Sequence, residues 1–312
     1  MTSVRKLSRI ILICREAEQL AEFYIRAFGF VHVEDSPKSD LGFAELIGFA
    51  NGQVRFKSLR LGNQVISLAE TQPPGRSYPK DVPNWDPRFQ HFAIVASDMA
   101  AAYANLQAVP NWTPISIDGP QVLPPSSGRV TAFKFRDPEG HPLELLAFPR
   151  GATPAQWEVK SGSLCLGIDH SAISVTDTSR SVAFYSRLGL ARTASTLNVG
   201  PEQEKLDNLV GAVVEVTALA IPMQAVPHVE LLCYRGKSDR RELSTNKNDV
   251  VATQLVFQVE GDGLDAIVAP SHDTTICRLS SVEGARLRAL LRDPDGHLLC
   301  IESADDALSQ SA

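Results

Sequence analysis

Cysteine is scarce in this sequence, and no stretch of the chain is strongly basic. The 312 residues include five cysteines, an odd number, and none of them forms a Cys-x-x-Cys pair. This pattern argues against a disulfide framework and favours reduced thiols, as in a cytoplasmic protein. Lys and Arg nowhere gather into a basic face and the formal net charge is −6, so no nucleic-acid partner is expected.

Long apolar runs are also missing. The longest early run, Ile10–Cys14, is far too short for the core of a signal peptide or for a membrane-spanning helix. We therefore expect a soluble cytoplasmic protein that has no membrane partner. The hydrophobic fraction of 44% suffices for a packed core, and the length allows two domains of ordinary size.

The most informative feature that is present is a repeated ten-residue segment. Residues 136–145 read RDPEGHPLEL and residues 292–301 read RDPDGHLLCI, so six of the ten positions are identical. The shared Asp-Pro-x-Gly-His part is typical of a turn between strands. The copies differ at one position inside the following strand, where the first has Glu144 and the second has Cys300.

Longer segments repeat as well. Arg9–Phe30 and His170–Leu190 each begin with alternating apolar residues, continue with helical spacing that includes a Phe-Tyr pair, and end at a glycine. Weaker copies start near His91 and Thr253, so the four starts lie 82, 79 and 83 residues apart (91 − 9, 170 − 91, 253 − 170). Several strand-like segments follow each start, which predicts an α+β fold of four βαβββ modules.

Segments rich in proline, glycine, serine or charge separate these modules, and they set the expected boundaries. The modules are predicted at residues 1–72, 73–150, 158–237 and 250–304, with a tail at 305–312.

Four such modules, with a Phe-Tyr pair in the first helix and DPxGHxLEL at the last hairpin, resemble the vicinal oxygen chelate superfamily. This group includes glyoxalase I, methylmalonyl-CoA epimerase, extradiol dioxygenases and the fosfomycin and bleomycin resistance proteins. The resemblance spans residues 7–302. It implies the glyoxalase/bleomycin resistance/dioxygenase fold, in which modules pair as half-barrels that form a cup. It also implies metal ligands at the start of a module's first strand and in the middle of its last strand.

Those ligand positions are occupied unequally in the four modules. Modules two and three each hold a His/Glu pair, whereas modules one and four hold none. The pairs are His91 with Glu144 and His170 with Glu230, and the other positions hold Arg9, Ser67, Thr253 and Cys300. Two imidazoles with two carboxylates would suit one divalent ion: Zn, Ni, Co, Mn or Fe.

The unequal occupancy favours a particular pairing of modules. If modules two and three pair, and modules one and four pair, one cup holds all four candidate ligands and the other holds none. The alternative pairing of one with two and three with four would leave one His and one Glu in each cup. Pairing across the two chains of a homodimer, rather than within a monomer, stays open.

The resemblance implies a metal-dependent lyase or isomerase of the glyoxalase I type that acts on a small molecule with vicinal oxygens. Glu144 or Glu230 would remove a proton next to a metal-bound carbonyl, and the sequence does not say which. One alternative is an extradiol dioxygenase, whose Fe(II) takes two His and one carboxylate. A second is a binding or resistance protein without turnover.

Several other polar residues are expected to have structural roles. His141 and His297 recur in both Gly-His turns whether or not the nearby glutamate is present, which indicates a role in the turn. Cys300 is expected to be a core residue. His228 lies two residues before Glu230 and would share its face of the strand, so we expect it near the site at most as a supporting residue.

Overall fold

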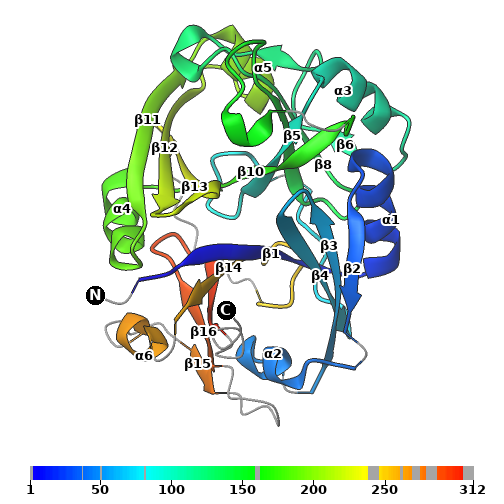
Figure 1. Cartoon of the computed structure of the whole chain (residues 1–312), viewed down its shortest axis with the longest axis vertical. Coiled ribbons are helices and arrows are strands. Elements are labelled where there is room, and N and C mark those ends of the chain that lie inside the picture. The colour runs from blue at the N-terminus through cyan, green and yellow to red at the C-terminus, as the bar shows by residue number, and fades with distance from the viewer. Residues whose placement is uncertain are drawn as a thin grey trace.

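Two curved β-sheets form the protein, one above the other in Figure 1, in a computed structural model of the chain. It describes residues 3–36, 38–49, 51–80, 82–158, 162–237, 246–260, 263–268, 275–278 and 287–304. The predicted tail at 305–312 lies outside the described residues. Among those described, no helix is long and apolar enough to cross a membrane.

Strands from the second and third modules make the upper sheet, which is cyan to yellow in Figure 1. Its order is β11-β12-β13-β10-β5-β9-β8-β6, and the short β7 pairs with β8. The strands are β5 (Gln90–Ala96), β6 (Thr113–Pro114), β7 (Gln121–Val122), β8 (Thr131–Arg136), β9 (Pro142–Ala147), β10 (Cys165–Ser174), β11 (Ala191–Val199), β12 (Val213–Ile221) and β13 (Gln224–Tyr234). The helices are α3 (Met99–Gln107), α4 (Thr178–Arg187) and α5 (Pro201–Asp207), with 3₁₀ turns at Pro125–Ser127 and Ala155–Trp157.

Strands from the first and fourth modules make the lower sheet, in the order β15-β16-β17-β14-β1-β4-β3-β2. The strands are β1 (Lys6–Cys14), β2 (Val31–Asp35), β3 (Gln53–Leu61), β4 (Gln64–Gln72), β14 (Gln254–Val259), β15 (Thr275–Arg278), β16 (Leu287–Arg292) and β17 (Leu298–Ser303). The helices are α1 (Ala17–Phe28), α2 (Leu41–Leu46) and α6 (Gly263–Val268).

The prediction that module two pairs with three, and one with four, is confirmed. Each sheet is continuous because the first strands of two modules pair antiparallel at its centre: β5 with β10 in one sheet and β1 with β14 in the other. Both pairs have a register shift at the same place, between Ile168 and His170 in β10 and between Leu7 and Arg9 in β1. The two sheets therefore share their register as well as their strand order.

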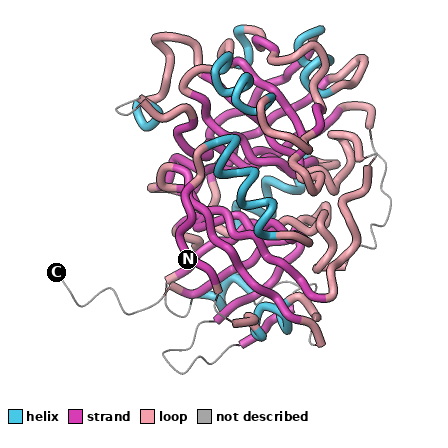
Figure 2. The backbone as a smooth tube through the Cα atoms, turned by 90° about the vertical axis from the view of Figure 1, so that its right-hand side faces the viewer, coloured by secondary structure: helices cyan, strands magenta, loops and turns pink. Residues whose placement is uncertain are grey.

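One face of each sheet packs into a core shared by both sheets. This core takes alternate residues of the central strands, such as Ile94, Leu145 and Leu255, together with the apolar faces of the helices. Figure 2 shows helix segments lying between the two layers of strands. The period of two along a strand leaves the remaining residues on the opposite, concave face, which we call the cup of each sheet.

The repeated turn joins modules that are neighbours in sequence but belong to different sheets. Tyr24 in α1 donates its hydroxyl proton to Asp137 of the first DPxGH turn, at 2.9 Å. In that turn His141 Nδ1 lies 2.8 Å from Asp137, and Nε2 lies 3.0 Å from the carbonyl oxygen of Ile13 in β1. The turn of the upper sheet is thereby tied to the first helix and strand of the lower sheet.

The second copy repeats these contacts in the other direction. Tyr185 in α4 donates to Asp293 at 3.1 Å, and His297 Nε2 lies 2.9 Å from the carbonyl oxygen of Ser174 in β10. Both histidines are buried within their turns. The expected turn role of His141 and His297 is therefore confirmed, and it extends to joining the two sheets.

Candidate metal centre

Four adjacent strands of the upper sheet carry the predicted ligands. In β9, Glu144 lies beside Ala93 of β5, and His91 is two residues earlier in β5 on the same face. In β13, Glu230 lies beside Ala172 of β10, and His170 is likewise two residues earlier. The strand order β13-β10-β5-β9 therefore brings all four side chains to the middle of one cup.

The two histidines approach each other because β5 and β10 are antiparallel. His170 lies opposite Ala93, and His91 lies opposite Ala172. The small alanine side chains leave room above the sheet for the two imidazole rings, whose centroids are 5.7 Å apart. The His/Glu pairs of modules two and three are therefore arranged symmetrically about the antiparallel pair of β5 and β10.

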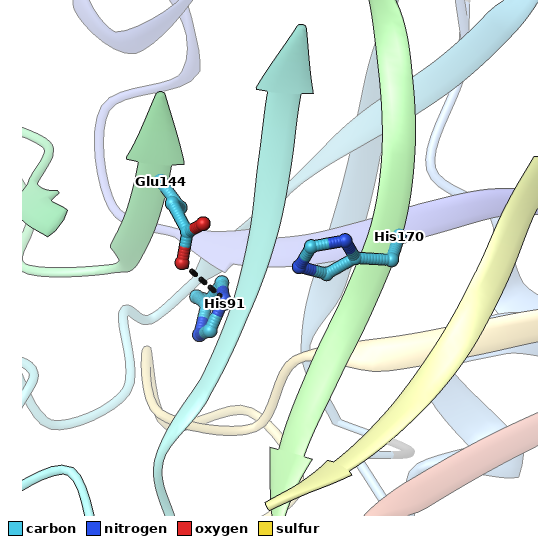
Figure 3. Close-up of side chains that lie close together, drawn as sticks. All are labelled: His91, Glu144 and His170. Carbon is cyan, nitrogen blue, oxygen red and sulfur yellow. Dashed lines mark ion pairs between the residues drawn. The ribbon is translucent and has the colours of Figure 1, made fainter. Parts of the chain in front are cut away.

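Three of the four side chains lie close together, and the fourth lies beside them. His91 Nε2 lies 3.2 Å from Glu144 Oε2, and His170 Nε2 lies 3.6 Å from Glu230 Oε2. Figure 3 shows Glu144, His91 and His170 pointing toward one another from three strands, and each offers a ligand atom within 4.8 Å of the others. Glu230 is the one predicted ligand outside this three-residue group.

Burial differs among the four residues. His91, Glu144 and His170 are all buried, whereas the Glu230 side chain keeps 20% of its surface exposed. His228 beside it is also partly exposed. Among the four predicted ligands, Glu230 is therefore the one most exposed to solvent, and Glu144 is enclosed by the protein.

The buried groups strongly perturb one another. Burial opposes the charge of His170, but the carboxylates of Glu230 and Asp169 outweigh burial and raise the pKa of His170 to about 9. Burial would raise the pKa of Glu230, but His170 and His228 lower it to about 2. Burial lowers the pKa of His91. The carboxylates of Glu230 and Asp169 and the imidazole of His170 thus favour one another's charged forms.

These residues fit a divalent ion. Nδ1 of the buried His91 ring makes no hydrogen bond to any described residue, and Nε2 has only the carboxylate of Glu144, at 3.2 Å and without hydrogen-bond geometry. A buried polar atom without a hydrogen bond is destabilising unless another partner satisfies it. Two imidazole nitrogens and carboxylate oxygens directed at one point are the donor set that Zn²⁺ and other first-row divalent ions take in proteins.

Asp169 is a supporting residue that the sequence analysis missed. Its Oδ2 accepts a hydrogen bond from His170 Nδ1 at 3.1 Å, and its Oδ1 accepts one from Trp157 Nε1 at 2.9 Å. The first bond turns His170 Nε2 toward the cup, in the way that a second carboxylate orients metal-binding histidines. The strand register shifts between Ile168 and His170, so Asp169 lies in the irregular part of β10 and its side chain contacts that of His170. No pattern in the sequence indicates such a shift.

His228 lies where its spacing predicted, on the same face as Glu230. Its Nε2 is 3.3 Å from Glu230 Oε1, and its Nδ1 is 3.9 Å from Asp169 Oδ2. Asp169, His170 and His228 form a second group whose ligand atoms lie within 4.8 Å of one another. His228 therefore contacts Oε1 of Glu230, the carboxylate oxygen that does not face His170.

The cup of the lower sheet has different residues at every corresponding position. Arg9 corresponds to His170, because it lies opposite Val256 as His170 lies opposite Ala93. Ser67 corresponds to Glu230, because it lies beside Ile11 as Glu230 lies beside Ala172. Arg9 does not face an open site: it makes two hydrogen bonds to Glu302, at 2.6 and 2.9 Å.

One expected correspondence is wrong. Val256 lies beside Cys300 as Ala93 lies beside Glu144, so the residue two positions earlier, Gln254, corresponds to His91. The sequence analysis assigned this position to Thr253. A slip of one residue along a strand moves a side chain to the opposite face, so Thr253 does not face this cup as His91 faces the other.

Apolar side chains line this second cup beside the ion pairs that Arg9 and Arg288 make with Glu302. Phe43, Leu46, Val256, Leu290 and Cys300 belong to one buried cluster there. The prediction that Cys300 is a core residue is confirmed: its side chain is fully buried, and burial raises the pKa of its thiol far above the usual range. The lower sheet therefore has the same fold as the upper sheet without its cluster of histidines and glutamates.

Comparison with known proteins agrees with the fold. The family model of the Glyoxalase/Bleomycin resistance protein/Dioxygenase superfamily matches residues 6–145. These residues, the first two of the four modules, match the vicinal oxygen chelate group that the sequence resembles. No curated protein matches the sequence significantly.

Solved structures with a similar fold include glyoxalase I and a putative dioxygenase. A point mutant of glyoxalase I from Zea mays superposes with a TM-score of 0.62 and 17% identity, covering 99% of this chain and 96% of that chain. Glyoxalase I from Zea mays gives 0.60 and 14%, covering 97% and 92%. A putative dioxygenase from Bacillus subtilis gives 0.58 and 14%, covering 97% and 86%. At these identities the likeness establishes the fold alone.

Proposed function

We propose that the protein is a divalent-metal-dependent lyase or isomerase of the glyoxalase I type, acting on a small molecule with vicinal oxygens. His91, His170, Glu144 and Glu230 would hold the ion. The observation that carries this proposal is the second glutamate: Glu230 lies 3.6 Å from His170, beside the three-residue group of His91, Glu144 and His170.

The two glutamates would have different roles. When bound, the metal would polarise a substrate carbonyl and stabilise the negative charge that follows proton removal. Glu144 is buried against His91 and would stay a fixed ligand. Glu230 is partly exposed, and its second oxygen lies beside His228. We assign Glu230 as the base that takes the proton next to the carbonyl.

Exchange of substrate protons with solvent tests this assignment. A panel of hydroxyketones and thiohemiacetals would be incubated in D₂O with the metal-loaded protein and followed by proton NMR. Because a positioned general base contributes roughly 10²–10⁴-fold, Glu230→Gln should lower the exchange rate by about that factor while the protein keeps its metal. Glu144→Gln should instead lose the metal. No exchange with any member of the panel would reject this function.

One observation favours a second function. The three-residue group of two His and one Glu is the ligand set of non-haem Fe(II) oxygenases. In an extradiol dioxygenase Glu230 would not be a ligand. Oxygen uptake with catechols by the iron-loaded protein, retained in Glu230→Gln, would favour that function. A protein that binds such molecules without turnover is the remaining outcome of these assays.

A further inference from the structure

A lysine is buried in the wall of the cup that holds the histidines and glutamates. Lys134 in β8 lies opposite Glu144 in β9, so the two side chains are on the same face of the sheet. Lys134 is only 3% exposed. Burying an ammonium group is costly by several kcal/mol unless charged and hydrogen-bonding partners compensate.

Asp207, the last residue of α5, supplies that partner. Its Oδ1 accepts from Lys134 Nζ at 2.7 Å and from Asn84 Nδ2 at 3.0 Å. Its Oδ2 accepts from Gln203 Nε2 at 2.6 Å and from the Tyr234 hydroxyl at 3.1 Å. Four donors fill the lone pairs of a carboxylate. Asp207 is therefore fixed in place, and it holds Lys134 at one position.

The ammonium keeps donors to spare. A lysine has three N–H groups, and Nζ of Lys134 makes one hydrogen bond among the described residues, the one to Asp207. Burial opposes its charge, but Asp207 and Glu144 outweigh burial and raise the pKa of Lys134. Its charge also acts on His91. A fixed ammonium with free N–H groups thus lies within electrostatic reach of the proposed ligands.

The fold does not require a cation there. In the lower sheet, Leu290 lies opposite Cys300 as Lys134 lies opposite Glu144. Leu290 is buried in the apolar cluster of that cup. Lysine occurs at this position only in the sheet that also carries the two His/Glu pairs, which links it to the site rather than to the architecture.

We propose that Lys134 is an anion-binding residue of this cup, and that the substrate is a small acid whose carboxylate contacts the Lys134 ammonium while its vicinal oxygens chelate the metal. The inference rests on the proposed function, because it places the substrate beside the same four residues. It adds a substrate class, and it gives Asp207 the role of holding the lysine in position.

Two metal chelators distinguish this role from a structural one. Oxalate has outer anionic oxygens beyond those that chelate, whereas acetohydroxamate has a methyl group there. Binding of each to the zinc-loaded protein would be measured by calorimetry. Lys134→Met should weaken oxalate about tenfold or more, which corresponds to about 1.4 kcal/mol, and should leave acetohydroxamate within about twofold.

The partner of the lysine gives a prediction of opposite sign. Asp207→Asn removes the competing carboxylate while it keeps an acceptor for Lys134, so oxalate should bind as well as before or more tightly. The double variant Lys134→Met/Asp207→Asn leaves no unpaired buried charge and should behave as Lys134→Met. The matched control is Lys205→Met. Lys205 is in α5, as Asp207 is, but it forms an exposed ion pair with Asp118, so this substitution should leave the binding of both chelators unchanged.

Each result decides between the possibilities. Equal weakening of both chelators in Lys134→Met, or weaker oxalate binding in Asp207→Asn, would show a structural role and overturn the anion-binding proposal alone. Oxalate binding that does not depend on Lys134 would do the same. If the wild-type protein bound neither chelator, the metal site of the proposed function would fall as well.

Discussion

The two cups of this molecule have one fold and different interiors. Both sheets have the same strand order, the same antiparallel central pair and a register shift at the same place. At the corresponding cup positions, the upper sheet has His91, Glu144, His170, Glu230, Asp169 and Lys134, and the lower sheet has Gln254, Cys300, Arg9, Ser67, Ser8 and Leu290.

This comparison separates what the fold needs from what the site needs. The residues that both halves keep, such as Tyr24 with Asp137 and Tyr185 with Asp293, join the sheets to each other. The residues that only one half has face its cup. A buried cluster of ionisable groups is unfavourable for stability by itself. The lower cup also holds buried charges, but there Arg9 and Arg288 are paired with Glu302 and Asp40. Among the described residues the cluster of histidines and glutamates occurs in the upper cup alone, which indicates function.

Among single substitutions of supporting residues, we expect the largest difference in metal affinity between the two cups at the register shift, where Asp169 lies in the upper sheet and Ser8 in the lower sheet. Asp169→Ala removes the acceptor that orients His170, and loss of such a partner weakens metal binding by about 10–100-fold. Ser8→Ala, at the corresponding place in β1, should leave affinity unchanged. Competition with a chromophoric zinc chelator measures both. Equal affinities in the two variants would contradict the role given to Asp169.

Metal binding should also release a proton from the upper cup. Because the folded pKa of His170 is raised to about 9, the metal-free protein holds this proton at pH 8, and its stabilising effect is lost as pH rises through about 9. A metal ligand must be deprotonated, so zinc binding at pH 8 should release about one proton, and fewer above pH 9. Calorimetry in buffers of different ionisation enthalpy measures this number. Heats independent of the buffer at pH 8 would contradict it.

The smallest expected effect is on stability, from the tyrosine–aspartate hydrogen bond that occurs in both copies of the repeated turn. Tyr24→Phe and Tyr185→Phe each remove one buried hydrogen bond to an aspartate, and each should lower the free energy of unfolding by about 1–2 kcal/mol. Neither should change metal affinity, because the contacts lie outside the cups. Urea unfolding gives the first quantity and metal competition the second. Loss of metal in Tyr185→Phe alone would show that the joint and the site are coupled.

The sequence predicted the architecture because the architecture is repeated. Four copies of one pattern identified the modules, and the uneven distribution of His/Glu pairs predicted how the modules pair. His228 also lay where its spacing placed it. The modules and the placing of His228 follow from repetition and periodicity along single strands, which the sequence records directly. The ligand positions behind the pairing prediction came from the resemblance to the vicinal oxygen chelate superfamily.

What the sequence did not predict depends on contacts between distant segments. Asp169 lies beside the site because of an irregularity in β10. Lys134 is held in the wall of the cup by its hydrogen bond to Asp207, 73 residues away in the chain. The misplacement of Thr253 has a similar cause. The weak fourth copy was aligned from Thr253, one residue before Gln254. Only the pairing of β14 with β17 identifies Gln254 as the cup residue.

Metal stoichiometry tests the central claim most directly, namely that one cup of two is a metal site. Protein purified without chelator, and then equilibrated with zinc and desalted, would be analysed by mass spectrometry for metal per chain. We expect one equivalent in the wild type, none in His91→Ala/His170→Ala, and one in Ser67→Ala/Gln254→Ala, the matched change in the other cup. Two equivalents in the wild type, or one retained in His91→Ala/His170→Ala, would contradict the account.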